Sequence, residues 1–125
     1  MLEDRNVVCA VFFDFCKAFD SVPHRLLLSK LTQLGLHESI VHWVSNYLTA
    51  RHQNVTVNGA TSDSTSAVSG VPQGSVLGPL LFLIYVNDLA SLPISDRSQL
   101  TLYADDLLLF RPISNSSDYY ILSER

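Results

Sequence analysis

The chain of 125 residues is poor in the residue types that mark several common protein classes. Its two cysteines, Cys9 and Cys16, form neither a CxxC pair nor a disulfide framework, so we expect two reduced thiols in or near the core. The four histidines lack the spacing of zinc ligands and are interpreted as surface or packing residues: His24, His37, His42 and His52. This pattern argues against a structural zinc site and against a disulfide-stapled secreted fold.

Long apolar stretches are also absent. The longest, residues 80–86, is too short to cross a bilayer, and the first residues carry acids where a signal peptide has its apolar region. We therefore expect no membrane partner. At the same time 47% of the residues are apolar, which excludes a disordered chain, and the length allows at most one domain.

Basic residues are the third shortage. Eight Lys and Arg residues stand against twelve Asp and Glu, which gives a formal net charge of −4. Nucleic-acid binders normally draw much of their affinity from Lys and Arg contacts to phosphates. Two interpretations stay open: the partner is not a nucleic acid, or the basic surfaces lie in parts of the protein outside this chain.

Three aspartates at the ends of apolar runs are the most informative residues that are present. Asp14 ends the run 7–13, and Asp105 and Asp106 lie between the runs 100–103 and 107–110. Successive side chains of a strand point to opposite faces, so two adjacent aspartates serve one site only where the chain turns. The pattern predicts a tight hairpin with its acids at the tip.

A neighbouring strand that ends at Asp14 would bring three carboxylates together. Such a cluster repels itself unless cations neutralise it, and oxygen-only ligands suit a hard cation such as magnesium. Two magnesium ions about 4 Å apart are the usual device for phosphoryl transfer in polymerases and nucleases. The alternative is ordinary turn chemistry, because Asp tolerates turn conformations and bonds its own backbone.

The remaining pattern mixes helices with a largely antiparallel sheet, which is the α+β class. Residues 7–13 lack polar alternation and predict a strand buried on both faces, in a central position. A helix starts at Pro23, carries an apolar residue every three or four positions and ends at Gly35. The pattern further predicts a helix over 38–50, strands over 53–57 and 62–69 around an Asn58-Gly59 turn, a helix over 80–89 and a polar loop from 114 onward.

A loop rich in glycine and proline, residues 70–79, precedes the last of these helices. Such a loop lets the backbone approach a ligand closely, although it lacks the GxxxxGK[ST] pattern of a P-loop. Its one long polar side chain is Gln73, whose amide offers both a donor and an acceptor. A structural turn with a solvated Gln73 is an equally open interpretation.

Three segments, in this order, resemble the palm of a reverse transcriptase of the non-LTR, LINE type of retrotransposon: residues 12–24 (FFDFCKAFDSVPH), 70–80 (GVPQGSVLGPL) and 102–106 (LYADD). The similarity runs from about residue 7 to residue 110. It implies an RNA-directed DNA polymerase whose palm is a ferredoxin-like antiparallel sheet with helices packed on one face. Residues 1–125 would then be a partial reverse transcriptase domain, a palm with adjoining finger elements.

The resemblance also implies roles for individual residues. Asp14 and Asp105 match the family's principal metal ligands, and Asp106 matches the third acid. Phe19 matches the aromatic beneath the sugar of the incoming nucleotide, which selects dNTPs by excluding a 2′-hydroxyl. Gln73 and Gly74 match the family's loop that positions the templating base pair and the incoming nucleotide. Tyr103 matches the residue that supports the hairpin beside the primer end.

The implied cofactor is a pair of Mg²⁺ ions, with Mn²⁺ as a substitute. The implied partners are a dNTP and an RNA or DNA template with its primer, whose 3′-hydroxyl receives the nucleotide. The sequence does not determine the localisation, and the resemblance is compatible with intracellular, nuclear action.

No segment matches the family's fingers that precede the first of the three motif segments, its thumb or the lysine of its later palm. We therefore expect a fragment with exposed apolar faces. Two alternatives stay open. One is a catalytically inactive, truncated remnant. The other is a metal-dependent nuclease or phosphohydrolase, which needs a water-activating base and has no use for Phe19 or the Gln73 loop.

Overall fold

A computed structural model describes residues 7–94 and 97–114, so the polar loop predicted beyond Ser114 lies outside the described residues. The chain forms two compact units, unit 1 with Met1–Phe15 and Asp88–Arg125, and unit 2 with Cys16–Asn87. The length predicted at most one domain. The structure divides the 125 residues between two compact units. Helices and strands both occur, which confirms the α+β class.

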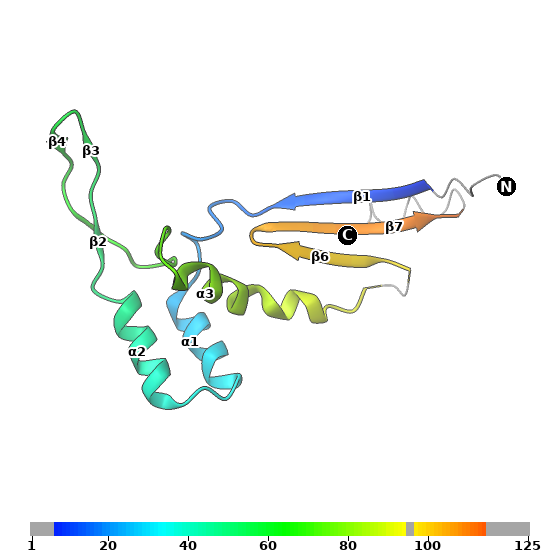
Figure 1. Ribbon diagram of the computed structural model, residues 1–125, viewed down its shortest axis with the longest axis horizontal. Helices are drawn as coiled ribbons and strands as arrows, with labels where there is room; N and C mark the ends of the chain where they lie inside the picture. The colour runs from blue at the N-terminus through cyan, green and yellow to red at the C-terminus, as the bar shows by residue number, and fades with distance from the viewer. Residues whose placement is uncertain (1–6, 95–96, 115–125) are drawn as a thin grey trace. The chain divides into compact units, whose positions relative to one another are not determined.

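Unit 1 contains a three-stranded antiparallel sheet in the order β1-β7-β6. Its strands are β1 (Val7–Asp14), β6 (Gln99–Tyr103) and β7 (Asp106–Ile113), and Figure 1 shows β7 between the other two. Valine and phenylalanine, which favour strands, make up most of β1. β1 and β7 pair over their whole lengths, from Val7 opposite Ile113 to Asp14 opposite Asp106.

The strand predicted over residues 7–13 forms, but the prediction that it is central and buried is wrong. β1 is an edge strand with one neighbour, and β7 takes the central place. The side chain of Phe12 is 78% exposed and that of Val7 is 53% exposed. An apolar run indicates a strand but does not specify its place in the sheet, because strand order is set by pairing between distant segments.

The expectation of exposed apolar faces is confirmed on this strand. The cysteines differ from each other: Cys9 is half-buried, as expected near a core, whereas Cys16 is exposed, which corrects the prediction for that residue.

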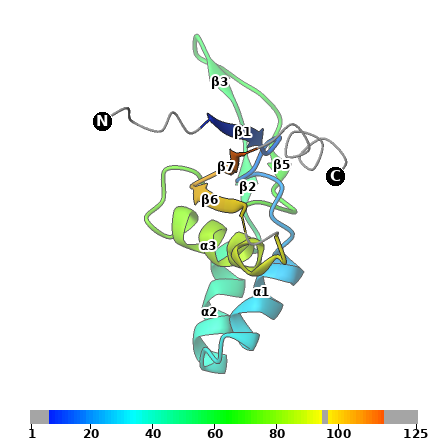
Figure 2. The ribbon, with the colours of Figure 1, turned by 90° about the vertical axis from the view of Figure 1, so that its right-hand side faces the viewer.

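Unit 2 contains three helices close to the predicted ranges: α1 (His24–Gln33), α2 (Glu38–Leu48) and α3 (Leu77–Val86). Pro23 is the N-cap of α1, and Gly35 follows its last turn with a φ of +78°, a conformation that glycine adopts without strain. α1 contacts both α2 and α3 (Figure 2). The core of the unit comes mainly from one face of each helix: Leu27, Leu31, Val44, Leu48, Leu81 and Phe82 are buried.

α3 differs from its prediction at both ends. It begins at Leu77, three residues before the predicted start, so that Pro79 lies in the first turn, where a missing N–H has no intrahelical partner to lose. It ends at Val86 and is followed by a 3₁₀ helix, η1 (Asn87–Ser91), over the residues that were predicted to complete it. None of the described helices is long and apolar enough to cross a bilayer.

The two strands predicted around the Asn58-Gly59 turn are broken into short ladders. β2 (His52–Gln53) pairs with β5 (Thr65–Ser66), and β3 (Thr56–Val57) pairs with β4 (Ala60–Thr61). The turn itself is confirmed, because Asn58 and Gly59 both have positive φ, as a type I′ hairpin requires. Between the ladders the N–H of Val55 donates to the hydroxyl of Ser62, so a side chain replaces a ladder bond.

The core of unit 2 provides a stability prediction. Leu27 is fully buried on α1 while Leu26, its neighbour, is 51% exposed. Leu27→Ala should lower the free energy of unfolding by about 2–5 kcal/mol, because it removes buried methyl groups and leaves a cavity. Leu26→Ala should change it by less than about 0.5 kcal/mol. Denaturant titration followed by circular dichroism measures both, and equal losses would contradict the packing described for α1.

Candidate functional site

The β6–β7 hairpin of unit 1 places the predicted acids where the chain turns. Ala104 and Asp105 form the turn, and Asp106 is the first residue of β7, opposite Tyr103. Ala104 alone has a positive φ, of 53°, the pattern of a type II′ turn, whose twist suits a hairpin. The prediction of a tight hairpin is confirmed, with Asp105 at the tip and Asp106 one residue into the strand.

Cross-strand pairing brings three of the predicted site residues into one row. Asp106 lies opposite Tyr103 of β6 and also opposite Asp14 of β1. Residues directly opposite each other in an antiparallel pair project from the same face of the sheet. The row Tyr103–Asp106–Asp14 therefore crosses all three strands on one face, with all three residues exposed, while Asp105 is half-buried in the turn.

Two of the three acids, and not all three, are brought together in this way. Within residues 7–94 and 97–114, no three His, Cys, Asp or Glu side chains gather closely enough to hold a metal ion. The convergence of Asp14, Asp105 and Asp106 on one cation stays a prediction. The carboxylate oxygens of Asp14 and Asp106 nevertheless suit magnesium as ligands. This ion is commonly bound by one or two carboxylates together with substrate phosphates.

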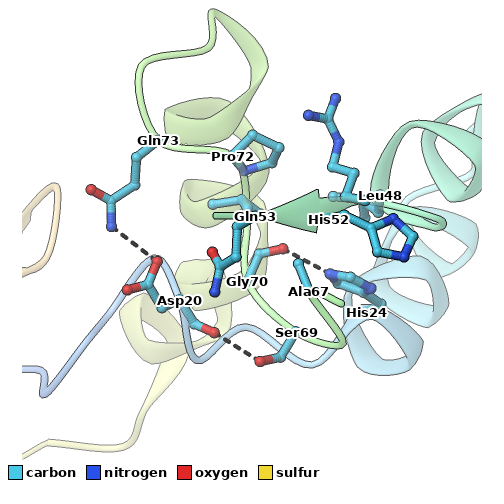
Figure 3. A pocket seen from close by; sticks show the side chains of 12 residues that line it. Asp20, His24, Leu48, His52, Gln53, Ala67, Ser69, Gly70, Pro72 and Gln73 are labelled. Atoms are coloured by element: carbon cyan, nitrogen blue, oxygen red, sulfur yellow. Dashed lines mark hydrogen bonds between the residues drawn. The ribbon is translucent and has the colours of Figure 1, made fainter. Parts of the chain in front are cut away.

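In unit 2, the segment after Asp14 is joined to the glycine-rich loop by backbone hydrogen bonds. The N–H of Val71 donates to the carbonyl of Phe19, and the N–H of Gly70 donates to the carbonyl of Val22, each at 2.8 Å. Two side chains extend the contact. The hydroxyl of Ser69 donates to the carbonyl of Asp20 at 2.9 Å. The His24 ring, half-buried, lies 2.8 Å from the carbonyl of Gly70, with Nε2 as donor (Figure 3).

Gly70 is the residue that allows this close approach. Its φ is +88°, and a Cβ atom built there would lie 2.7 Å from the Cα atom of Asp20, closer than side-chain carbons come to backbone. Only a residue without a side chain fits between the two segments. We call the contact of residues 19–24 with residues 69–73 the loop clamp.

The loop clamp positions two of the predicted substrate residues. The ring of Phe19 stacks on that of Phe82, with centroids 4.6 Å apart and planes inclined by 27°. Phe82 is only 2% exposed whereas Phe19 is half-buried, so Phe19 is neither a fully enclosed core residue nor a free surface ring. Gln73 is exposed, and its Nε2 donates to Oδ1 of Asp20 at 3.0 Å.

Gly74, the third predicted residue of unit 2, has a φ of +75° and nothing within 4 Å of a Cβ built on it. A side chain there would be strained by backbone conformation, although it would have space. The turn of the loop thus favours glycine at this position.

A cavity of about 340 Å³ lies beside the loop clamp, within unit 2. Its lining combines polar and apolar residues (Figure 3). The polar ones are Asp20, His24, Arg51, His52, Gln53, Ser69 and Gln73. Sequence reasoning assigned no chemistry to Asp20, His24 or Ser69. Asp20 and His24 lie inside the motif segment 12–24, and Ser69 immediately precedes the segment 70–80. This position is the signal that marks them.

The predicted site residues thus form two sets. Asp14, Asp106 and Tyr103, with Asp105 at the turn, belong to unit 1, and Phe19, Gln73 and Gly74 belong to unit 2. The first set offers carboxylate oxygens. The second offers the aromatic ring of Phe19 and the amide of Gln73, which lines the cavity.

Comparison with known families identifies one matching family model. The model described as reverse transcriptase (RNA-dependent DNA polymerase) matches residues 1–118, a range that includes both sets of site residues.

Similar curated proteins carry corresponding names. A probable RNA-directed DNA polymerase from transposon X-element of Drosophila melanogaster is 37% identical over 100 residues, which cover 78% of this chain and 11% of that protein. The one from transposon BS of the same fly is also 37% identical, over 112 residues that cover 86% of this chain and 12% of that protein. A retrovirus-related Pol polyprotein from type-1 retrotransposable element R2 of Popillia japonica is 30% identical over 109 residues, covering 79% and 18%. The chain spans less than a fifth of the length of these curated relatives.

The loop clamp provides the second prediction. Gly70→Ala and Gly59→Ala both place a side chain at a positive φ, but only the first brings it against backbone. Gly59→Ala should lower the free energy of unfolding by about 1–2 kcal/mol through φ alone. Gly70→Ala should lower it by about 1–3 kcal/mol more, because the clash forces the two segments apart. Denaturant titration of the two variants compares them, and equal losses would show that the loop clamp is looser than described.

Proposed function

The chain belongs to the reverse transcriptase (RNA-dependent DNA polymerase) family, and from this premise we propose that it carries the nucleotidyl-transfer site of a non-LTR retrotransposon polymerase. The reaction joins a dNTP to the 3′-hydroxyl of a primer that is paired to a template. The observation that carries the proposal is the row of Asp14, Asp106 and Tyr103 beside the hairpin tip Asp105.

Asp14, Asp105 and Asp106 are the proposed ligands of divalent cations, Mg²⁺ or Mn²⁺. Their carboxylates provide only oxygen, which suits hard cations, and two of them project from the same face of neighbouring strands. Bound magnesium supplies the positive charge that favours deprotonation of the primer hydroxyl and neutralises the leaving pyrophosphate. The contribution of the three acids is to hold that charge at a fixed place at one end of the sheet.

Phe19, Gln73 and Gly74 are the proposed contacts to the incoming nucleotide. The Phe19 ring is supported from one side by the buried Phe82, so its position is fixed by packing and it can act as a steric limit for the sugar. Gly74 adopts the positive φ of the loop beside Gln73 without strain. Tyr103 is 81% exposed beside Asp106 and is the proposed support of the hairpin at the primer end.

In structural terms we assign the β1-β7-β6 sheet to the palm, with the ferredoxin-like arrangement implied by the family. The hairpin of β2 to β5 is assigned to the adjoining finger elements. The proposed partners are a dNTP and a template-primer. With a net charge of −4 this segment has little electrostatic attraction for phosphates, so its proposed contribution is chemistry and nucleotide selection rather than template affinity.

Primer extension tests the proposed function. Residues 7–114 would replace the aligned segment of the transposon BS polymerase, with the parent enzyme as positive control. The chimaera should extend a DNA primer on an RNA template with dNTPs and Mg²⁺. Asp105→Asn should reduce extension by more than about 100-fold, beyond the 10–100-fold that typically follows from changing an outer-shell partner of a metal.

Asp63→Asn is the matched control, because Asp63 is an exposed carboxylate of the β2–β5 hairpin. It should leave extension unchanged. An inactive chimaera beside an active parent would contradict the proposed function, and normal extension by Asp105→Asn would contradict the proposed metal ligands.

A separate prediction concerns the choice of sugar. In the same chimaera, Phe19→Val and Phe19→Ala should raise the use of rNTPs relative to dNTPs by roughly 10-fold or more, because removal of ring atoms opens space for a 2′-hydroxyl. The measurement is the ratio of kcat/KM for rNTP and dNTP. Trp43→Ala serves as control, since Trp43 is an aromatic of α2 that is 54% exposed. An unchanged ratio in the Phe19 variants would show that this ring only packs against Phe82.

A further inference from the structure

Asp20 is fixed to the glycine-rich loop through both its backbone and its side chain. Its carbonyl accepts from the Ser69 hydroxyl at 2.9 Å, and its carboxylate oxygen Oδ1 accepts from Nε2 of Gln73 at 3.0 Å (Figure 3). The residues on either side of it, in the range 19–22, are bonded to Val71 and Gly70. Asp20 is therefore the point at which the loop clamp meets the exposed side chain of Gln73.

The chemistry of this contact determines which end of the Gln73 amide faces Asp20. A carboxylate only accepts hydrogen bonds, whereas a glutamine amide donates through nitrogen and accepts through oxygen. The nitrogen must therefore face Asp20, and Figure 3 shows the amide oxygen directed away from that carboxylate. One N–H of Gln73 is engaged, and within residues 7–94 and 97–114 its Oε1 and second N–H have no other hydrogen-bond partner.

The backbone that carries this carboxylate is closely packed. A Cβ atom built on Gly70 would lie 2.7 Å from the Cα atom of Asp20. The exposed carboxylate projects from this packed backbone, and its hydrogen bond to Nε2 favours one orientation of the long Gln73 side chain before any ligand arrives. Ordering beforehand removes an entropic cost from binding, because the rotamers of a free glutamine no longer have to be restricted by the ligand.

We propose that Asp20 is a positioning residue, which holds the Gln73 amide so that Oε1 accepts a hydrogen bond from a hydroxyl or N–H donor of the incoming nucleotide. This inference rests on the proposed function for the identity of the ligand. The link between Asp20 and Gln73 is a property of unit 2 and is measurable without activity.

Nuclear magnetic resonance of the isotope-labelled chain tests the link directly. The side-chain amide protons of Gln73, assigned by their loss in Gln73→Met, should exchange slowly with water and shift on Asp20→Ala. Asp63→Ala should leave them unchanged, because Asp63 is an exposed acid elsewhere in unit 2. Identical Gln73 signals in the unsubstituted chain and in Asp20→Ala would overturn the proposal.

Kinetics of the transposon BS chimaera test the consequence for the reaction. Asp20→Ala should raise KM for dNTP about 10-fold, the size expected for loss of a hydrogen bond to a charged group, with kcat changed by less than about twofold. In the Gln73→Met background, Asp20→Ala should not raise KM for dNTP any further. A residue that acts only through Gln73 has no effect once the Gln73 amide is removed. Additive effects would show that Asp20 acts by another route.

A swap that conserves charge separates positioning from general structural damage. Gln73→Glu alone places two carboxylates side by side and should raise KM for dNTP by about 10-fold. Adding Asp20→Asn gives position 20 an amide that donates to the carboxylate at position 73. The two positions together then carry the same net charge as in the unsubstituted chain, and KM for dNTP should return toward its original value. No recovery in the double variant would count against the proposal. If the unsubstituted chimaera is inactive beside an active parent, the proposed function fails, and the resonance experiment still decides the position of Gln73.

Discussion

The contact on which unit 2 depends is the pairing of backbone groups in the loop clamp. Phe19 and Val22 offer carbonyls to the N–H groups of Val71 and Gly70, and these bonds join segments about fifty residues apart in the chain. The pairing requires a glycine at position 70, since any Cβ atom there would enter the backbone of Asp20. The stack of Phe19 on Phe82 and the contact of Gln73 with Asp20 both follow from it.

A second constraint acts in unit 1, where the register of two strand pairs determines the positions of the acids. A shift of one residue in β7 would move Asp106 to the other face of the sheet, away from Asp14. The two-residue turn at Ala104 and Asp105 fixes the register of β7 against β6. The register of β7 against β1 depends on pairing between segments that are distant in the chain. The register thus places two carboxylates on the same face of neighbouring strands.

Local sequence patterns predicted the existence of the three helices and the position of the two hairpin turns, because each of these features depends on residues close together in the chain. α1 and α2 begin within a residue of the expected positions, and the Asn58-Gly59 and Ala104-Asp105 turns occur as expected. The wrong predictions concern the place of a strand in its sheet and the continuity of strand pairing. β1 is an exposed edge strand, although its composition is that of a buried one, and the strands flanking Asn58-Gly59 are interrupted where Ser62 bonds Val55.

The sequence by itself determined the membership of the family and the identity of the candidate site residues, since motifs such as KAFD, GVPQGS and YADD need no structure to be read. Only the tertiary structure decided that Asp14 lies opposite Asp106, that Gly70 is pressed against Asp20, and that Asp20 holds Gln73. The physical reason is the distance along the chain. Periodicity and turn preference act over a few residues, whereas a hydrogen bond between residues 20 and 73 depends on how the intervening helices pack.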